Sequence, residues 1–165
     1  MRLPHQPEGP ARRLALDLPA VHAAVRQARN AVRTFAKFDG MTADECEHLT
    51  LVVAELMSNA VDHGGGGGAV ELADQVAGVR MELDLELAAD HWTVTVRDQG
   101  EGDAAKLAPK LDEELPDLTD DRGRGLFLLQ AMVDELTIGP RKDMDGLEVR
   151  VTKKVSPAGP APDED

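Results

Sequence analysis

The chain has 165 residues, of which 42% are hydrophobic and only 2% aromatic, and its formal net charge is −13. This length suits one domain with a continuous core and is too short for two. The excess of acidic residues argues against nucleic acid as a partner, because binding to a phosphate backbone requires clustered Lys and Arg. Cys46 is the single cysteine, which excludes an internal disulfide and a zinc site built on paired cysteines.

No segment is apolar over a length that would span a bilayer, and the N-terminus has no apolar run of signal-peptide length. We therefore expect a cytoplasmic protein without membrane contact. Both ends are rich in Pro, Gly and charge, so residues 1–11 and 156–165 are expected to be flexible tails. The folded part is expected to be one domain, residues 12–155.

The first predicted elements follow from a change in hydrophobic period. Residues 13–18 alternate Leu with more polar residues, which is typical of a half-buried strand. In the next segment apolar residues recur every three or four positions, which predicts a helix that ends before Gly40. Thr42 followed by Glu45 is a capping box, and it predicts a second helix that runs to about His63.

The second half of the chain returns to strands. Residues 79–87 and 91–98 alternate and are joined by a short turn, which predicts an antiparallel hairpin. After a long segment rich in charge and loop formers, residues 125–136 predict a helix and residues 147–152 a last strand. This order predicts an α+β two-layer sandwich, with a mixed or mostly antiparallel sheet and helices on one face.

Three polar residues spaced four apart, Glu55, Asn59 and His63, form a stripe on the otherwise apolar second helix. A polar stripe is ordinarily the solvated face of a helix. The residue types favour a functional interpretation, because Glu can accept a proton and Asn offers a neutral oxygen ligand suited to Mg²⁺ beside phosphates. The helix dipole alone can explain His63, since it favours a cation at the C-terminal end.

A second candidate motif is DQGEG, residues 98–102. Asp and glycine at the end of a strand can simply form a turn. In the functional interpretation Asp98 binds the exocyclic amine of a purine. Gly100 and Gly102 would then let the backbone lie close under the base.

A third candidate motif is RGRGL, residues 122–126. It can be a loop that enters a helix, with Gly125 near the N-terminal cap. It can also be a glycine lid whose backbone N–H groups face phosphate oxygens, with Arg122 or Arg124 adding charge. The long preceding loop favours a lid, because loops of this length inside compact domains often cover ligands.

In their order and context the three motifs resemble the GHKL, or Bergerat-fold, ATPase superfamily. Its pattern is Glu-x-x-x-Asn on a helix, Asp-x-Gly-x-Gly after a strand, and a loop leading to Gly-x-Gly at the start of a helix. The resemblance covers nearly the whole folded length. ELMSNAVDHG, DQGEG and GRGLFLLQAMVDEL are most similar to the anti-sigma-factor serine kinases of the RsbW and SpoIIAB type.

The resemblance implies a role for each matching residue. Glu55 would be the general base on the incoming nucleophile, Asn59 the Mg²⁺ ligand, and Asp98 the residue that specifies adenine. The other positions would contact the nucleotide: His63 near the phosphates, Gly100 and Gly102 in the turn, Arg122, Gly123, Arg124 and Gly125 in the lid, and Thr152 beside Asp98. For Thr152, plain β-propensity is an equally good explanation.

Five consecutive glycines, residues 64–68, depart from the family pattern at the exit of the second helix. They have no side chain that would fix the chain beside the phosphates. They form either a passive linker or an unusually mobile wall of the nucleotide pocket.

The resemblance implies an ATP- and Mg²⁺-dependent protein-serine kinase that also binds and inhibits a sigma factor. Its phosphoryl acceptor would be a small anti-anti-sigma protein of the STAS type, and family members pair as homodimers. One alternative is an ATP-binding module without kinase activity, in which nucleotide sets the shape of a partner-binding surface. Another is the ATPase domain of a histidine kinase, which is disfavoured because no segment before Arg12 could form dimerisation helices.

Overall fold

The computed structural model describes residues 10–64, 69–74, 78–100 and 121–155, with the side chains of 121–124 excepted. Residues 1–9 of the predicted N-terminal tail and the predicted tail 156–165 lie outside this part. The same holds for residues 65–68 of the glycine run and for the predicted lid loop, residues 101–120.

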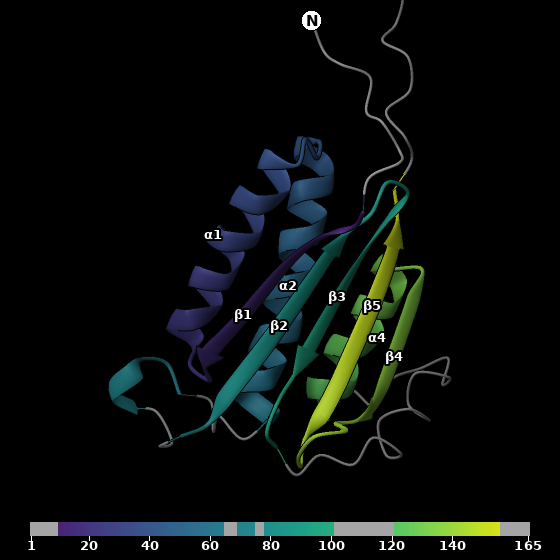
Figure 1. Ribbon diagram of the computed structural model, residues 1–165. Helices are drawn as coiled ribbons and strands as arrows, with labels where there is room; N and C mark the ends of the chain where they lie inside the picture. The colour runs from purple at the N-terminus through teal and green to yellow at the C-terminus, as the bar shows by residue number, and fades with distance from the viewer. Residues whose placement is uncertain (1–9, 65–68, 75–77, 101–120, 156–165) are drawn as a thin grey trace, which may run out of the picture.

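The described strands form one five-stranded sheet in the order β1-β2-β3-β5-β4, and every neighbouring pair is antiparallel. The strands are β1 (Arg12–Pro19), β2 (Arg80–Leu87), β3 (His91–Arg97), β4 (Glu135–Pro140) and β5 (Leu147–Lys154). The helices are α1 (His22–Phe38), α2 (Ala43–His63), the short 3-10 helix η1 (Leu72–Asp74) and α4 (Asp121–Met132). The α-helices cover one face of the sheet (Figure 1), which confirms the predicted α+β two-layer sandwich.

The core lies between the α-helices and the sheet. The period of two along β2 turns Met81, Leu83 and Leu85 inward, and each is at most 1% exposed. Trp92 on β3 is the largest buried side chain, and α2 packs Leu49 and other aliphatic residues against the sheet. Aliphatic side chains therefore fill most of the core, as the low aromatic content predicts.

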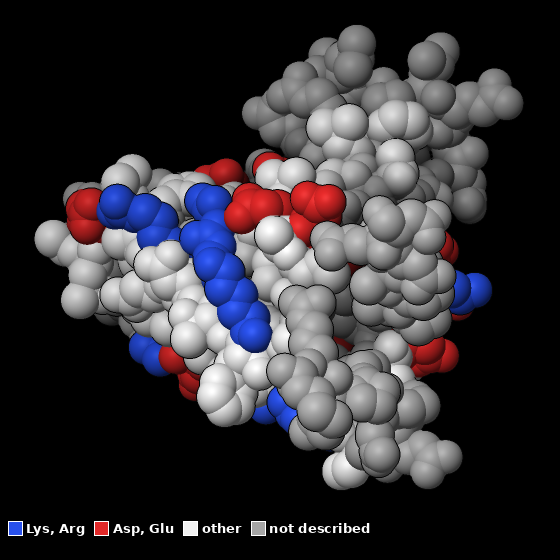
Figure 2. Space-filling model, turned by 90° about the horizontal axis from the view of Figure 1, so that it is seen from above, with Lys and Arg blue, Asp and Glu red and all other residues white. Residues whose placement is uncertain are grey.

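The second face of the sheet carries ion pairs between neighbouring strands. Arg97 on β3 donates to Asp84 on β2, and its Nε donates to Glu148 on β5 at 2.8 Å. At one end of the molecule Figure 2 shows Lys and Arg side chains next to Asp and Glu.

The first two helices begin in different ways. The N–H groups of His22 and Ala23 donate to the carbonyls of Ala69 and Val70 at 2.8 and 2.9 Å, so the segment after the glycine run caps α1. The Thr42 hydroxyl accepts from the N–H of Glu45 at 3.3 Å, which confirms the predicted N-cap of α2. In the described part of the chain, no helix is long and apolar enough to cross a bilayer.

The prediction of one helix over residues 125–136 is wrong at both ends. Helix α4 already begins at Asp121, and it ends at Met132, whose carbonyl accepts from His48 Nε2 of α2 at 2.7 Å. Residues from Glu135 form β4, an edge strand paired with β5. Leu136 thus reaches the core from a strand opposite Val151, although it also fits the helical spacing.

Candidate functional site

Asp98 occupies a buried turn directly after β3, and the residue is 4% exposed. Its Oδ1 accepts from the backbone N–H groups of Gly100 and Leu147, each at 3.0 Å. Its own N–H donates to the Leu147 carbonyl at 3.0 Å. These bonds fix the carboxylate where β3 ends and β5 begins.

Two glycines allow other backbone segments to approach Asp98 closely. A Cβ at Gly64 would lie 2.5 Å from Asp98 Cβ, and a Cβ at Gly146 would lie 2.0 Å from the Asp98 carbonyl oxygen. Gly146 also has a φ of 142°, which L side chains rarely adopt. The N–H of Gln99 donates to the Gly64 carbonyl at 3.3 Å. The first glycine of the run is therefore required by packing at the end of α2, whichever interpretation holds for the rest.

Arg141, in the connection between β4 and β5, holds the other side of the Asp98 turn. Its side chain is 2% exposed, and Nη1 donates to the Asp98 carbonyl at 3.2 Å. Neither Arg141 nor Gly146 is among the predicted site residues, because the sequence did not predict β4 or the connection that follows it. No local pattern links Arg141 to the site, since the Asp98 carbonyl that it contacts is 43 positions away.

The stripe on α2 occupies the C-terminal part of the helix, and Gly64 at the end of this helix packs against Asp98. Glu55 is exposed, Asn59 is partly buried, and His63 is exposed as the last residue of α2. Asn59 precedes Gly64 by five positions, which is about 7.5 Å along a helix, and Glu55 lies about 6 Å further back. Figure 1 shows this end of α2 at the same end of the sheet as the end of β3 and the start of β5.

Helix α4 approaches the Asn59 amide. A Cβ at Gly125 would lie 3.5 Å from Asn59 Nδ2 and 3.6 Å from its Oδ1. Asn59 Nδ2 is buried and has no hydrogen-bond partner among the described residues. The structure thus brings together Asn59 and Gly125, two residues from motifs far apart in the sequence.

For the other predicted lid and turn residues, the structure gives at most the backbone. Gly102 lies outside the described residues. Arg122, Gly123 and Arg124 lie in the first turn of α4. Because α4 begins at Asp121, Gly125 lies within the helix and not at its N-terminal cap.

The structure does not bring Thr152 to Asp98. In the β3–β5 register Thr152 pairs with Thr93, whereas Glu148 pairs with Arg97, the neighbour of Asp98. Four positions along a strand are about 13 Å. The Thr152 hydroxyl instead shares a 3.2 Å hydrogen bond with the Thr93 hydroxyl. Position 152 is therefore corrected to a structural one, and the N–H of Leu147 provides the β5 contact to Asp98.

The described residues contain no group of three or more His, Cys, Asp or Glu side chains that could hold a metal ion. Mg²⁺ does not need such a group, because it usually takes one or two protein ligands and completes its shell with phosphates and water. The Asn59 amide oxygen is a ligand of the hard type that Mg²⁺ prefers. The site therefore fits Mg²⁺ that arrives with a phosphate-bearing ligand.

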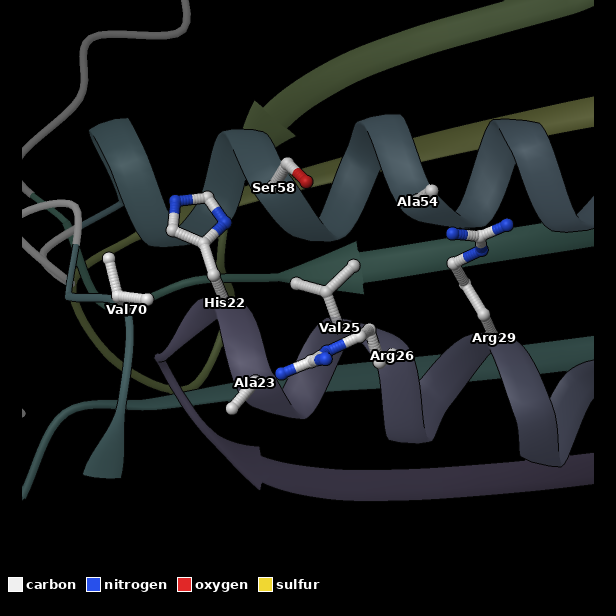
Figure 3. A pocket seen from close by; sticks show the side chains of 8 residues that line it. All are labelled: His22, Ala23, Val25, Arg26, Arg29, Ala54, Ser58 and Val70. Carbon is white, nitrogen blue, oxygen red and sulfur yellow. The ribbon is translucent and has the colours of Figure 1, made fainter.

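A pocket of about 350 Å³ lies away from these residues, between α1 and α2 (Figure 3). His22, Arg26 and Arg29 contribute its cationic or titratable side chains, and Ser58 lines it from α2. None of the predicted site residues lines it. This pocket is therefore a surface separate from the predicted site residues.

Comparison with known proteins defines the class to which this fold and site belong. Residues 18–153 match the model of the histidine kinase-like ATPase domain, and the chain belongs to this family. The serine-protein kinase RsbW of Halalkalibacterium halodurans is 31% identical over 156 residues, which cover 90% of this chain and 85% of that kinase. The GHKL resemblance, and within it the RsbW-like branch, is thereby confirmed.

A second relative and a solved structure are also similar to this chain. RsbW of Staphylococcus epidermidis is 31% identical over 104 residues, so the matched part spans 60% of this chain and 61% of that kinase. The crystal structure of the SiaB–SiaC complex from Pseudomonas aeruginosa contains a chain of the same fold, with a TM-score of 0.60 at 15% identity. That alignment covers 84% of this chain and 88% of the other.

Proposed function

We propose that the protein is an ATP- and Mg²⁺-dependent protein-serine kinase that acts in the cytoplasm. It phosphorylates a small anti-anti-sigma protein of the STAS type and, as a homodimer, binds a sigma factor. The observation that carries the proposal is the Asp98 turn, a buried carboxylate fixed by two backbone N–H groups at the end of the helix that bears Glu55 and Asn59. The likeness to the RsbW serine-protein kinases supports the same reaction.

Asp98 is the residue that selects the base. Gly100 and Leu147 hold the Asp98 carboxylate through Oδ1, and we assign this carboxylate to the exocyclic amine of adenine. Guanine has a carbonyl oxygen at the corresponding ring position, and two acceptors would then face each other. A buried polar group that loses its partner costs about 1–3 kcal/mol, so this one contact can favour adenine over guanine by about fivefold to about a hundredfold.

Asn59 and α4 bind the phosphates in this proposal. The Asn59 amide oxygen would ligate Mg²⁺, which when bound neutralises charge on the transferring phosphoryl group. The buried Nδ2 would donate to a phosphate oxygen. The N-terminal turn of α4, which holds Arg122, Gly123 and Arg124, would direct backbone N–H groups toward the same phosphates.

Glu55 is the general base for the protein acceptor. It is exposed and lies one helical turn before Asn59, so a serine of a second protein can reach it. The serine oxygen forms a bond to the γ-phosphorus while the bond from that phosphorus to the bridging oxygen breaks. ADP leaves with the electron pair of that bond, and Glu55 takes the serine proton.

The test is transfer of label from γ-phosphate-labelled ATP with Mg²⁺ into proteins of an extract from the source cell. We expect acid-stable label on one small protein, and a decrease of about a hundredfold or more in Glu55→Ala. Glu47→Ala is the matched control, because Glu47 is also exposed on α2 but lies two turns before Glu55.

Equal labelling by Glu55→Ala and the wild type would remove the role assigned to Glu55. ATP binding without any labelled acceptor would favour the non-catalytic module. Acid-labile label would favour phosphohistidine chemistry of the histidine kinase type.

A further inference from the structure

Arg141 combines a permanent charge with near-complete burial, and the proposed reaction does not use it directly. Its side chain is 2% exposed at the end of the sheet where Asp98 lies. Buried charges are retained where they are paired and hydrogen-bonded. The partners of Arg141 therefore indicate what it does.

The guanidinium of Arg141 is held by two carboxylates. Nε and Nη2 donate to the two oxygens of Asp143 at 3.0 and 2.9 Å, and Nη2 also donates to Glu82 on β2. The hydrogen bond with Asp143 is the main cause that raises the pKa of Arg141. The backbone N–H of Arg141 donates to the Gly146 carbonyl at 3.0 Å and closes the β4–β5 connection.

The third nitrogen of the Arg141 guanidinium, Nη1, donates to the Asp98 carbonyl at 3.2 Å. That carbonyl also faces Gly146, where a Cβ would be only 2.0 Å away. The Asp98 backbone is thus fixed from one side by Arg141, while Gly100 and Leu147 fix its carboxylate from the other. If the carbonyl rotated, the Gly100 N–H would move away from Oδ1.

We propose that Arg141 is a positioning residue for base recognition. It acts through Asp98, by locking the turn so that the carboxylate meets adenine in one orientation. This inference rests on the proposed function, because it requires Asp98 to contact the base. Loss of Arg141 should therefore weaken the preference for adenine over guanine and leave phosphoryl transfer at saturating ATP nearly unchanged.

The experiment measures equilibrium binding of ATP and GTP, with Mg²⁺, to the purified full chain. Arg141→Met keeps the aliphatic stem and removes the donors, and Arg141→Lys keeps the charge without the fork. Arg97→Met is the matched control, because Arg97 also joins two carboxylates across strands but donates to Asp84 and Glu148.

We expect the ratio of ATP to GTP affinity to fall about tenfold in Arg141→Met and less in Arg141→Lys, and to stay at the wild-type value in Arg97→Met. Transfer at saturating ATP should stay within about twofold, since Arg141 contacts no reacting atom in the proposal. If Arg141→Met unfolds below the assay temperature, the ratio of ATP to GTP affinity in Arg141→Lys tests the inference instead.

A wild-type ratio in the Arg141 variants would overturn the inference and leave the proposed function unaffected, because that function is tested by transfer of label. A wild-type protein that binds no ATP would overturn both.

Discussion

The side chains of the candidate site differ in how many of their hydrogen-bonding atoms have a partner in the protein. Asp98 Oδ1 has two backbone donors, whereas the buried Asn59 Nδ2 has no partner among the described residues. A buried donor without a hydrogen-bond partner costs about 1–3 kcal/mol of stability. In the proposed function a phosphate oxygen would be the acceptor for this donor.

Cys46 gives a prediction for a single residue outside the site. It is 1% exposed, and burial is the main cause that raises the pKa of its thiol. The reactive form is the thiolate, so reaction with Ellman's reagent at pH 8 should be at least about a hundredfold slower in the native protein than in denaturant. Equal rates in both states would contradict the burial of Cys46.

The sign of the pH dependence follows from the direction of this shift. A pKa that folding raises contributes stability that is fully present below the unfolded pKa of the thiol. That contribution is lost as the pH rises through the folded pKa. Cys46→Ala should therefore reduce the loss of stability at alkaline pH, measured by urea unfolding at several pH values.

At the residue scale the sequence predicts what is local and misses what is not. Glu55 and Asn59 share one helix face, and Asp98 follows a recognisable strand. Spacing marks these residues as candidates, and the family resemblance implies their roles. Arg141 reaches Asp98 only through the pairing of β4 with β5. The family resemblance implies that Thr152 lies beside Asp98, but the register puts it beside Thr93.

At the element scale, the strength of the end signals decides which predictions succeed. Helix α2 has a capping threonine, a long apolar period and a glycine at its end, and the structure agrees with the prediction at both ends. Strand β4 has no comparable signal. Leu136 fits the helical period as well as the strand period, and its pairing with β5 decides between them.

Thr42 tests the N-terminal end of α2. Thr42→Ala removes the acceptor for the Glu45 N–H and should lower the free energy of unfolding by about 1 kcal/mol, whereas Thr42→Ser should retain most of it. Glu55 lies 13 positions further along α2, or about 20 Å, so ATP affinity should not change. Urea unfolding and nucleotide titration check both parts, and an alanine variant as stable as the wild type would rule out the cap.

At the scale of the whole molecule, the sheet divides the protein into a packed side and a charged side. The helices bury the aliphatic core on one face, while ion pairs such as Arg97 with Glu148 span the other. The proposed nucleotide site uses neither face. It lies at one end, where α2, β3 and β5 meet and α4 approaches.

The overall architecture could be predicted because most of its elements, namely β1, α1, α2, β2, β3 and β5, have a periodic pattern of their own. The sequence could not predict the strand order or the contacts of the β4–β5 connection, since both depend on pairing between distant segments. The pocket between α1 and α2 was missed for the same reason, because its residues come from two helices and from the segment that caps α1.

The most direct test of the account is ATP binding by Asp98→Asn, measured by isothermal titration with Mg²⁺ beside the wild type. Asn keeps an oxygen that can accept from Gly100 and Leu147, so these two hydrogen bonds can still form. It replaces the second oxygen by an amide donor, which would face the donor amine of adenine. We predict that ATP affinity falls about a hundredfold. Wild-type affinity in Asp98→Asn would contradict the assignment of Asp98 as the adenine-binding residue, and with it the central claim.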